Sequence, residues 1–286
     1  MTDDKNLNWL ITGVSSGLGH ALAEAALAQG DVVVGTARNT ADIERFEALA
    51  DGRAHGHLLD VTHDDAITQV VADAESQTGG IDVLVNNAGY GLVGAIEEAS
   101  LEEIRQQFAV NVFGAIAVTQ AVLPFMRKRR TGHVLSISSV SGLAPWAGTG
   151  VYGASKYALE GFGQNLAKEV AELGIKVTNV EPGALRTDFA GRSLVTAARQ
   201  IGDYDGAARD ALRTLQDATS RENGDPAKAA RAILKMVAAD DPPLHFLLGS
   251  DALYYAGDKL GSMQAEIAKW APYTTGIAFD EDDGAL

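Results

Sequence analysis

The chain has 286 residues, of which 38 are acidic and 23 basic, and its formal net charge is −15. A charge of this sign repels polyphosphates and anionic lipids, so neither nucleic acid nor a membrane surface is expected as a partner. Cysteine is absent, which excludes disulfides, thiolate nucleophiles and cysteine zinc sites, and no metal centre is predicted.

The N-terminal segment argues against secretion. It reads Met-Thr-Asp-Asp-Lys-Asn-Leu-Asn-Trp, with acids where a signal peptide has bases, and its apolar stretch is interrupted at Gly13. No later apolar run is expected to approach the roughly 20 residues that span a bilayer. A cytoplasmic location is therefore predicted, and the lack of cysteine fits it.

Short runs of aliphatic and β-branched residues alternate with longer stretches of helical periodicity. Strands are predicted at Trp9–Thr12, Val32–Ala37, His57–Val61, Ile81–Asn86, His133–Ser138, Lys176–Val180 and His245–Leu248. Helices are predicted at Leu18–Gln29, Ala41–Ala50, Asp64–Thr78, Leu101–Arg129, Tyr152–Leu173 and Ala227–Ala239. This alternation predicts an α/β fold, a doubly wound (Rossmann) and mostly parallel sheet of about seven strands with helices on both faces.

No repeat or linker divides the chain, so residues 1–286 are predicted to form a single Rossmann-type domain. Residues 186–225 break the alternation as a long connection with a helical signal at Ala207–Thr219, and they are predicted to be a substrate lid. The acidic tail, residues 280–286, is interpreted as a solvated end rather than an interaction motif.

A glycine-rich turn joins the first strand to the first helix. Gly13 would turn the chain, Gly17 would let the backbone approach a pyrophosphate, and Gly19 would allow close helix–strand packing. An ordinary βα turn is the alternative, but its place at the first turn of a doubly wound sheet favours dinucleotide binding. The predicted phosphate-binding residues are Gly13, Ser15, Ser16, Gly17, Leu18 and Gly19.

The spacing Thr-Gly-x-x-x-Gly-x-Gly in residues 12–19 resembles the short-chain dehydrogenase/reductase family. Residues 86–89, Asn-Asn-Ala-Gly, end the fourth strand as they do in that family, and the resemblance runs to about residue 190. A strand-end turn is the alternative for this tetrapeptide. The resemblance implies a nicotinamide oxidoreductase, with further cofactor contacts from Asp60, Val61, Asn87, Ala88 and Gly89.

The end of the second strand bears on the choice of nicotinamide cofactor. An acidic residue there grips the ribose 2′-hydroxyl of NAD, whereas an arginine accommodates the 2′-phosphate of NADP. Here Ala37 takes the acidic position and Arg38 follows it, while Asp31 lies at the other end of the strand. NADP(H) is therefore predicted, and a solvated loop charge is the alternative interpretation of Arg38.

Tyr152 and Lys156 lie four residues apart on one face of a predicted helix. Such a pair is common by chance, but Asn111 precedes it on the fourth-to-fifth crossover and Ser139 ends the fifth strand. By resemblance these four are the family's Asn, Ser, Tyr and Lys set. Taken singly, each has a structural alternative as a cap, a buried amide, a packed ring or a solvated charge. His133 is interpreted as structural.

The resemblance assigns a role to each of these residues. A phenol with an ordinary pKa near 10 is a poor acid or base at neutral pH, so Lys156 is expected to lower the pKa of Tyr152 while binding the nicotinamide ribose. Ser139 would hold the substrate oxygen beside Tyr152. Asn111 would hold a water that relays protons to Lys156.

After the sixth strand, residues 182–187 match the family's Pro-Gly-x-x-x-Thr, which closes over the nicotinamide. The resemblance adds Pro182, Gly183, Leu185 and Thr187 to the predicted cofactor contacts. A mostly apolar substrate pocket is predicted from Tyr90–Val93, from Phe189–Tyr204, and from Ser139–Val151 with its Leu143, Trp146 and Val151. It favours a neutral carbonyl compound or secondary alcohol, although Arg186, Arg192 and Arg199 leave an anionic substrate open.

The predicted function is an NADP(H)-dependent ketoreductase or alcohol dehydrogenase with a Ser-Tyr-Lys(-Asn) proton-transfer mechanism. Two alternatives remain: a dinucleotide-binding regulator without turnover, and a lyase or epimerase that uses the same tyrosine. A homodimer or homotetramer is expected through Leu101–Arg129 and Tyr152–Leu173, partly from the resemblance and partly because these helices are more apolar than one sheet face requires.

Overall fold

A computed structural model describes residues 6–187, 189, 193–206, 208–210, 213 and 222–277. Seven strands form one parallel sheet in the order β3-β2-β1-β4-β6-β7-β9. They are β1 Asn8–Thr12, β2 Val32–Ala37, β3 Ala54–Leu58, β4 Val83–Asn86, β6 Gly132–Ile137, β7 Ile175–Pro182 and β9 His245–Leu248. The predicted doubly wound fold is confirmed.

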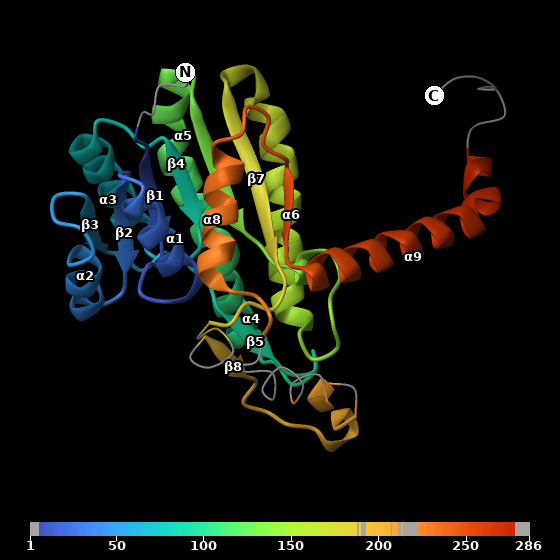
Figure 1. Ribbon diagram of the computed structural model, residues 1–286. Helices are drawn as coiled ribbons and strands as arrows, with labels where there is room; N and C mark the ends of the chain where they lie inside the picture. The colour runs from blue at the N-terminus through green and yellow to red at the C-terminus, as the bar shows by residue number, and fades with distance from the viewer. Residues whose placement is uncertain are drawn as a thin grey trace.

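Helices cover both faces of this sheet (Figure 1). They are α1 Gly17–Ala28, α2 Thr40–Glu47, α3 Asp64–Thr78, α4 Leu101–Phe108, α5 Ala115–Arg129, α6 Gly150–Val170, α8 Pro226–Val237 and α9 Ser250–Thr274. Strand side chains alternate between faces, so Trp9 and Ile11 join the core under α1 and α8, whereas Leu10 joins the core under α3, α5 and α6.

The order of the strands in the sheet indicates the edge at which a ligand would bind. From β1 the sheet grows through β2 and β3 in one direction and through β4, β6, β7 and β9 in the other. The connections that leave the carboxyl ends of β1 and β4 therefore diverge, and ligands of doubly wound sheets bind in the crevice at such a switch point.

Two predicted elements differ in their detail. β3 ends at Leu58 rather than Val61, because Asp60 accepts hydrogen bonds from the backbone and hydroxyl of Thr62 and turns the chain out of the strand. The predicted helix Leu101–Arg129 is interrupted by a π-helical segment, η1, at Ala109–Gly114.

Other elements were not predicted. β5 (Gly91–Val93) and β8 (Leu194–Thr196) form a separate two-stranded parallel sheet. The 25-residue helix α9 follows β9. The acidic tail and most of the predicted helix Ala207–Thr219 lie outside the described residues.

Within the part of the chain that the structure describes, one helix could cross a membrane by length and composition alone. It spans Leu101–Arg129, with a mean hydropathy of 1.7 in its most apolar 18-residue window, so the expectation that no apolar run approaches that length does not hold for it. Core helices of soluble proteins also meet this criterion, and Val118, Val122 and Met126 are buried in the core against the sheet.

Two buried polar residues that were not predicted to be functional, His133 and Asp31, form hydrogen bonds inside the fold. His133 is buried in β6, where its Nε2 lies 2.9 Å from Thr178 Oγ1 and burial lowers its pKa to about 4. Asp31 is buried too, and it accepts a 2.8 Å hydrogen bond from Trp9 Nε1 and one from the Leu7 amide. It ties the start of β1 to β2.

Candidate active site

The glycine turn between β1 and α1 depends on its glycines for different reasons. Gly13 and Gly17 have φ angles of +75° and +65°, a region that side chains with a Cβ rarely adopt. At Gly19 a Cβ would lie 2.3 Å from Asn87 Nδ2 and 2.5 Å from the Gly13 carbonyl oxygen. Any larger residue there would push apart the turn and the end of β4.

Thr12 and Asn87 fasten this turn to the end of β4. The Asn87 side-chain amide donates to the carbonyls of Thr12 and Gly13, at 2.9 and 2.8 Å. The Thr12 hydroxyl accepts hydrogen bonds from the backbone amides of Asn87 and Ala88, both at 3.0 Å. Asn86 instead points into the core and donates to Thr119 Oγ1.

The N-terminus of α1 is open to an anion. Its N-cap, Ser16, makes no side-chain capping bond, and no acidic residue lies in the first turn. The amides of the first turn therefore remain as donors, and the helix dipole favours negative charge there. Thr187 Cβ lies 3.9 Å from where a Cβ on Gly17 would stand, so Thr187 lies beside the turn, and its predicted contact with the nicotinamide stays a prediction.

Arg38 and Asp60 lie beside the same edge of the sheet. Arg38 is exposed after β2 and makes no hydrogen bond or ion pair with a described residue. Burial raises the pKa of Asp60, but hydrogen bonds from Thr62 and the charges of His63 and Arg38 outweigh it and lower that pKa. Arg38 is therefore placed where a further anion could recruit its guanidinium.

Ser139, Tyr152 and Lys156 come together at the carboxyl end of β6. Ser139 begins a short 3₁₀ turn, η2 (Val140–Gly142), where its Oγ accepts the Ser141 amide at 3.1 Å. Ser139 lies close enough to Tyr152 to act on the pKa of its phenol, which it lowers. One helical turn further along α6, the Lys156 Nζ donates to the Ile137 carbonyl at 2.7 Å and lies 5.7 Å from the centre of the Tyr152 ring.

The pKa of the phenol differs from expectation. The Tyr152 side chain is half-buried, and burial raises the pKa of Tyr152 to about 12 despite the opposing influence of Ser139. Burial lowers the pKa of Lys156 to about 8, against the charge of Glu160. Lys156 does not lower the phenol pKa as expected, because its ammonium is directed at the Ile137 carbonyl.

Asn111 lies in the π-helical segment η1 and is 1% exposed. Its Nδ2 donates to the Tyr90 carbonyl at 2.9 Å and to Ser155 Oγ at 3.2 Å, and its Oδ1 accepts the Tyr90 amide at 3.1 Å. Single-turn π segments are frequent at functional sites. Here the segment joins the loop after β4 to the helix that carries Tyr152 and Lys156.

The segments predicted to line a substrate pocket are neighbours. Tyr90–Val93 and Phe189–Tyr204 meet through the pairing of β5 with β8, and the Phe189 ring lies 5.7 Å from the Tyr152 ring. Leu92, Val151 and Ala197 form one buried apolar cluster beside them.

The other predicted pocket residues have partners of their own. Trp146 packs at 5.1 Å against Tyr255 of α9, so its ring supports that helix. Arg186 donates to the Glu222 carbonyl, and Arg199 lies 3.9 Å from a Glu97 carboxylate oxygen. Arg192 is outside the described residues.

A buried acidic group that the sequence analysis missed lies one turn beyond Lys156. Glu160 of α6 and Glu181 of β7 are 2% and 0% exposed, and Nδ1 of the half-exposed His245 lies 2.6 Å from Glu181 and 3.4 Å from Glu160. Their ligand atoms fall within 4.8 Å of one another, which would suit a metal ion. Burial and the neighbouring Glu160 raise the pKa of Glu181 to about 9, so a shared proton also satisfies this group.

Glu181→Gln should make the melting temperature less dependent on pH. The unfolded chain loses this proton near 4.5 and the folded chain near 9, so the stability that the proton contributes is present below pH 4.5 and lost as pH rises through about 9. Between pH 5 and 9 the wild-type Tm should therefore fall by at least ~2 °C more than that of the variant. Melting curves with exposed Glu169→Gln as control test this, and parallel curves would contradict it.

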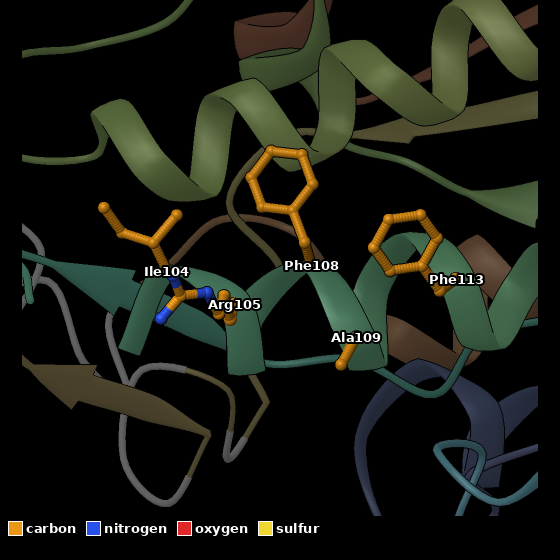
Figure 2. A pocket seen from close by; sticks show the side chains of 5 residues that line it. All are labelled: Ile104, Arg105, Phe108, Ala109 and Phe113. Carbon is orange, nitrogen blue, oxygen red and sulfur yellow. The ribbon is translucent and has the colours of Figure 1, made fainter. Parts of the chain in front are cut away.

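A separate apolar depression lies on the outer surface of α4 and η1. Its volume is about 470 Å³, and Ile104, Arg105, Phe108, Ala109 and Phe113 line it (Figure 2). Phe113 is 63% exposed and Leu101 67%. This surface belongs to the helix through which self-association is predicted.

Residues 8–196 match the family model described as short chain dehydrogenase. The chain is 38% identical to 3-ketodihydrosphingosine reductase of Bacteroides thetaiotaomicron, covering 84% of this chain and 87% of that protein. It is also 38% identical to human retinol dehydrogenase 8, covering 82% and 79%. A crystal structure of a short-chain dehydrogenase from Streptomyces avermitilis superimposes with a TM-score of 0.90 at 41% identity, covering 97% of this chain and 100% of that one.

Solved structures of related fold contain nicotinamide dinucleotides. Serine dehydrogenase complexed with NADP⁺ is 27% identical, with a TM-score of 0.73 and coverage of 85% of this chain and 94% of that one. A Burkholderia phymatum protein in complex with NAD is 22% identical, with a TM-score of 0.81 and coverage of 93% and 97%, and shows likeness of fold alone. Both cofactors therefore occur among proteins of this architecture.

Proposed function

The chain belongs to the short-chain dehydrogenase family of oxidoreductases, and from this membership we propose that it transfers a hydride between NADP(H) and the carbonyl or secondary alcohol of a mainly apolar small molecule. The observation that carries the proposal is that Ser139, Tyr152 and Lys156 come together at the carboxyl end of β6, where Lys156 Nζ lies 5.7 Å from the centre of the Tyr152 ring. These side chains lie at the same edge of the sheet as the open glycine turn.

The residues at that edge suit a dinucleotide. The uncapped amides of α1 and the glycines of the turn would receive the pyrophosphate, and residues 182–187 would cover the nicotinamide. Asp60, Val61 and the Asn87–Gly89 loop would contact the adenosine and the ribose. A bound nicotinamide supplies or accepts the hydride, and the protein must move one proton.

Tyr152 is the proposed proton donor in the reduction direction. With its pKa raised to about 12, the phenol is protonated at neutral pH and can donate to the substrate oxygen that becomes an alcohol. Ser139 would donate to the same oxygen and hold it in place. In the oxidation direction Tyr152 must first lose its proton.

Lys156 and Asn111 are proposed to support that transfer. The Lys156 ammonium, now bonded to the Ile137 carbonyl, would bind the nicotinamide ribose and stabilise a phenolate on Tyr152. Asn111 would position a water in the relay that returns a proton to Lys156.

The preference for NADP(H) is proposed from Arg38. Arg38→Ala should cost on the order of 2 kcal/mol in kcat/KM with NADPH, the value of a charge-assisted contact, and little with NADH. Arg45→Ala is the matched control, because Arg45 lies in the following helix, α2, and pairs there with Asp42. Steady-state kinetics with both cofactors decide the point, and equal losses with NADH and NADPH would show that Arg38 does not reach a 2′-phosphate.

The substrate is proposed to be apolar because Leu92, Ala197 and Val151, which directly precedes Tyr152, form an apolar cluster and because Arg186 is engaged with the backbone. A panel of apolar ketones and alcohols, assayed by the absorbance of the reduced cofactor, tests the function. Product analysis without net cofactor turnover would favour a lyase or epimerase. Dinucleotide binding without turnover of any substrate would favour a regulator.

The remaining proposals concern the whole chain. We propose a single domain with residues 186–225 as the lid, a solvated acidic tail and a cytoplasmic location. Members of this family act on small molecules and are generally oligomeric. Exposed Leu101, Phe113 and Tyr157 support self-association through α4, α5 and α6, and light scattering measures it.

A further inference from the structure

Helix α9 leaves the body of the protein and projects away from it (Figure 1). Only its first turns are packed: Ala252 and Ala256 are 0% and 1% exposed, and Tyr255 contacts Trp146. From residue 257 to residue 277 no side chain is buried. Most of a 25-residue helix therefore has no partner within the described part of its own chain.

The exposed part of this helix is strongly apolar. Nine large apolar side chains that the described structure leaves exposed lie between Leu253 and Ile277. Leu253, Leu260 and Ile267 recur every seven residues, and Ala256, Met263 and Trp270 follow each of them by three. This spacing of three and four is the heptad pattern with which helices pair in coiled coils.

We propose that residues 253–277, which we call the arm, pair antiparallel with the arm of a second copy of the chain. In antiparallel pairing Leu260 of one copy lies against Met263 of the other. The residues just before Leu260 and Ile267 in the heptads are Lys259 and Glu266, and in this register Lys259 faces Glu266 of the second copy on both sides of the two-fold axis. The charges of the helix therefore complement those of a second, antiparallel copy of the same helix.

The same register explains the exposed residues at the root of the helix. Trp270 of one copy comes beside Leu253 of the other, which is 61% exposed, and next to it Tyr254 is 68% exposed. The five exposed side chains of the heptad pattern, Leu253, Leu260, Met263, Ile267 and Trp270, form the seam between the two copies. The contact is isologous and closes as a dimer.

A second copy fits this helix better than a lipid surface does. Helices that lie on membranes carry an excess of Lys and Arg on their polar face. Here Lys259 and Lys269 are offset by Asp251, Asp258 and Glu266, and the whole chain carries a net charge of −15. The arm is also distant in sequence from the depression on α4 and η1, so it adds an interface to the association proposed for that surface.

Sedimentation velocity of the full chain over a range of micromolar concentrations tests the pairing. Met263→Glu should halve the mass of the assembly, whereas Ala265→Glu, on the opposite side of the arm, should leave it unchanged. Lys259→Glu and Glu266→Lys should each weaken association by roughly threefold to tenfold, because each brings like charges together twice. The double variant restores opposite charges and should recover the wild-type mass.

Cysteine cross-linking tests the register, because the natural chain has no cysteine. On oxidation, a mixture of Leu260→Cys and Met263→Cys proteins should give more disulfide-linked dimer than a mixture of Leu260→Cys and Ala265→Cys. An unchanged mass for Met263→Glu, or failure of the double charge variant to recover, would overturn the proposal. An arm variant that keeps the mass of the assembly but loses binding to phosphatidylcholine vesicles would also overturn the proposal.

Discussion

Tyr152→Phe should lower kcat for ketone reduction by roughly 10²- to 10⁴-fold, the contribution of a positioned general acid. The change removes one hydroxyl that holds the transferable proton and keeps the ring that packs against Phe189. The dissociation constant of the dinucleotide should change little, since the lost interaction belongs to the transition state. Stopped-flow kinetics and fluorescence titration of the reduced cofactor measure the two quantities separately.

Tyr157→Phe is the matched control for this variant. Tyr157 lies on the same helix and donates its hydroxyl to the Leu143 carbonyl at 2.5 Å, so the control loses a phenolic hydrogen bond outside the proposed proton path. It should keep kcat within a few-fold while losing about 1 kcal/mol of stability. A Tyr152→Phe protein that reduced a good ketone at the wild-type rate would remove Tyr152 from the mechanism.

The raised pKa of Tyr152 gives the same assignment a pH dependence. The phenol must be protonated to reduce a ketone and ionised to oxidise an alcohol. Burial raises its pKa to about 12, so the rate of alcohol oxidation should rise with pH by up to about tenfold per unit. Reduction should stay level over the same range. If product release does not limit the rate, an oxidation rate of the wild-type protein that is independent of pH would contradict this.

The sequence was sufficient to predict the sheet and its functional edge because both depend on local patterns. Buried parallel strands are short apolar runs, and glycines with positive φ such as Gly13 and Gly17 mark the turn. The contacts that fix this edge were less accessible. Asn87 is predicted to contact the cofactor, and in the structure its side-chain amide binds the carbonyls of Thr12 and Gly13, some 75 residues away in sequence.

The arm was missed because α9 lacks the signals on which helix prediction relies. Glycines at 257 and 261 and Pro272 interrupt its helical pattern, and each of them disfavours a helix. β5 and β8 were not predicted for a different reason. Each has three residues, too few to show alternation, and their pairing depends on bringing together segments about 100 residues apart.

The acidic group beside the site could have been suspected from one signal. Glu160 occurs within the predicted helix Tyr152–Leu173 and Glu181 directly follows the predicted strand Lys176–Val180, and a buried acid needs a partner or a proton. Their mutual contact is tertiary, since it depends on α6 crossing β7. The same holds for the pKa of Tyr152: sequence places Lys156 one turn away, but only the structure directs its ammonium to the Ile137 carbonyl.

Lys156→Met should damage function more than stability. The ammonium is proposed to bind the nicotinamide ribose and to stabilise the phenolate, so both the affinity for the dinucleotide and kcat should fall, each by roughly tenfold or more. Methionine fills nearly the same space without a charge. Lys168→Met, at an exposed position of the same helix, is the control and should leave both quantities unchanged.

The effect of Lys156→Met on stability follows from its lowered pKa. The folded chain holds this proton only below about pH 8, whereas the unfolded chain holds it to about 10.5, so below pH 8 the buried ammonium destabilises the fold by on the order of 3 kcal/mol. Losing the hydrogen bond to Ile137 offsets about 1 kcal/mol of the gain from its removal. At pH 7 the variant should therefore melt no lower than wild type, and it should lack the wild-type gain in stability between pH 8 and 10.5. A variant that binds dinucleotide normally but melts several degrees lower would show that Lys156 serves the fold rather than the reaction.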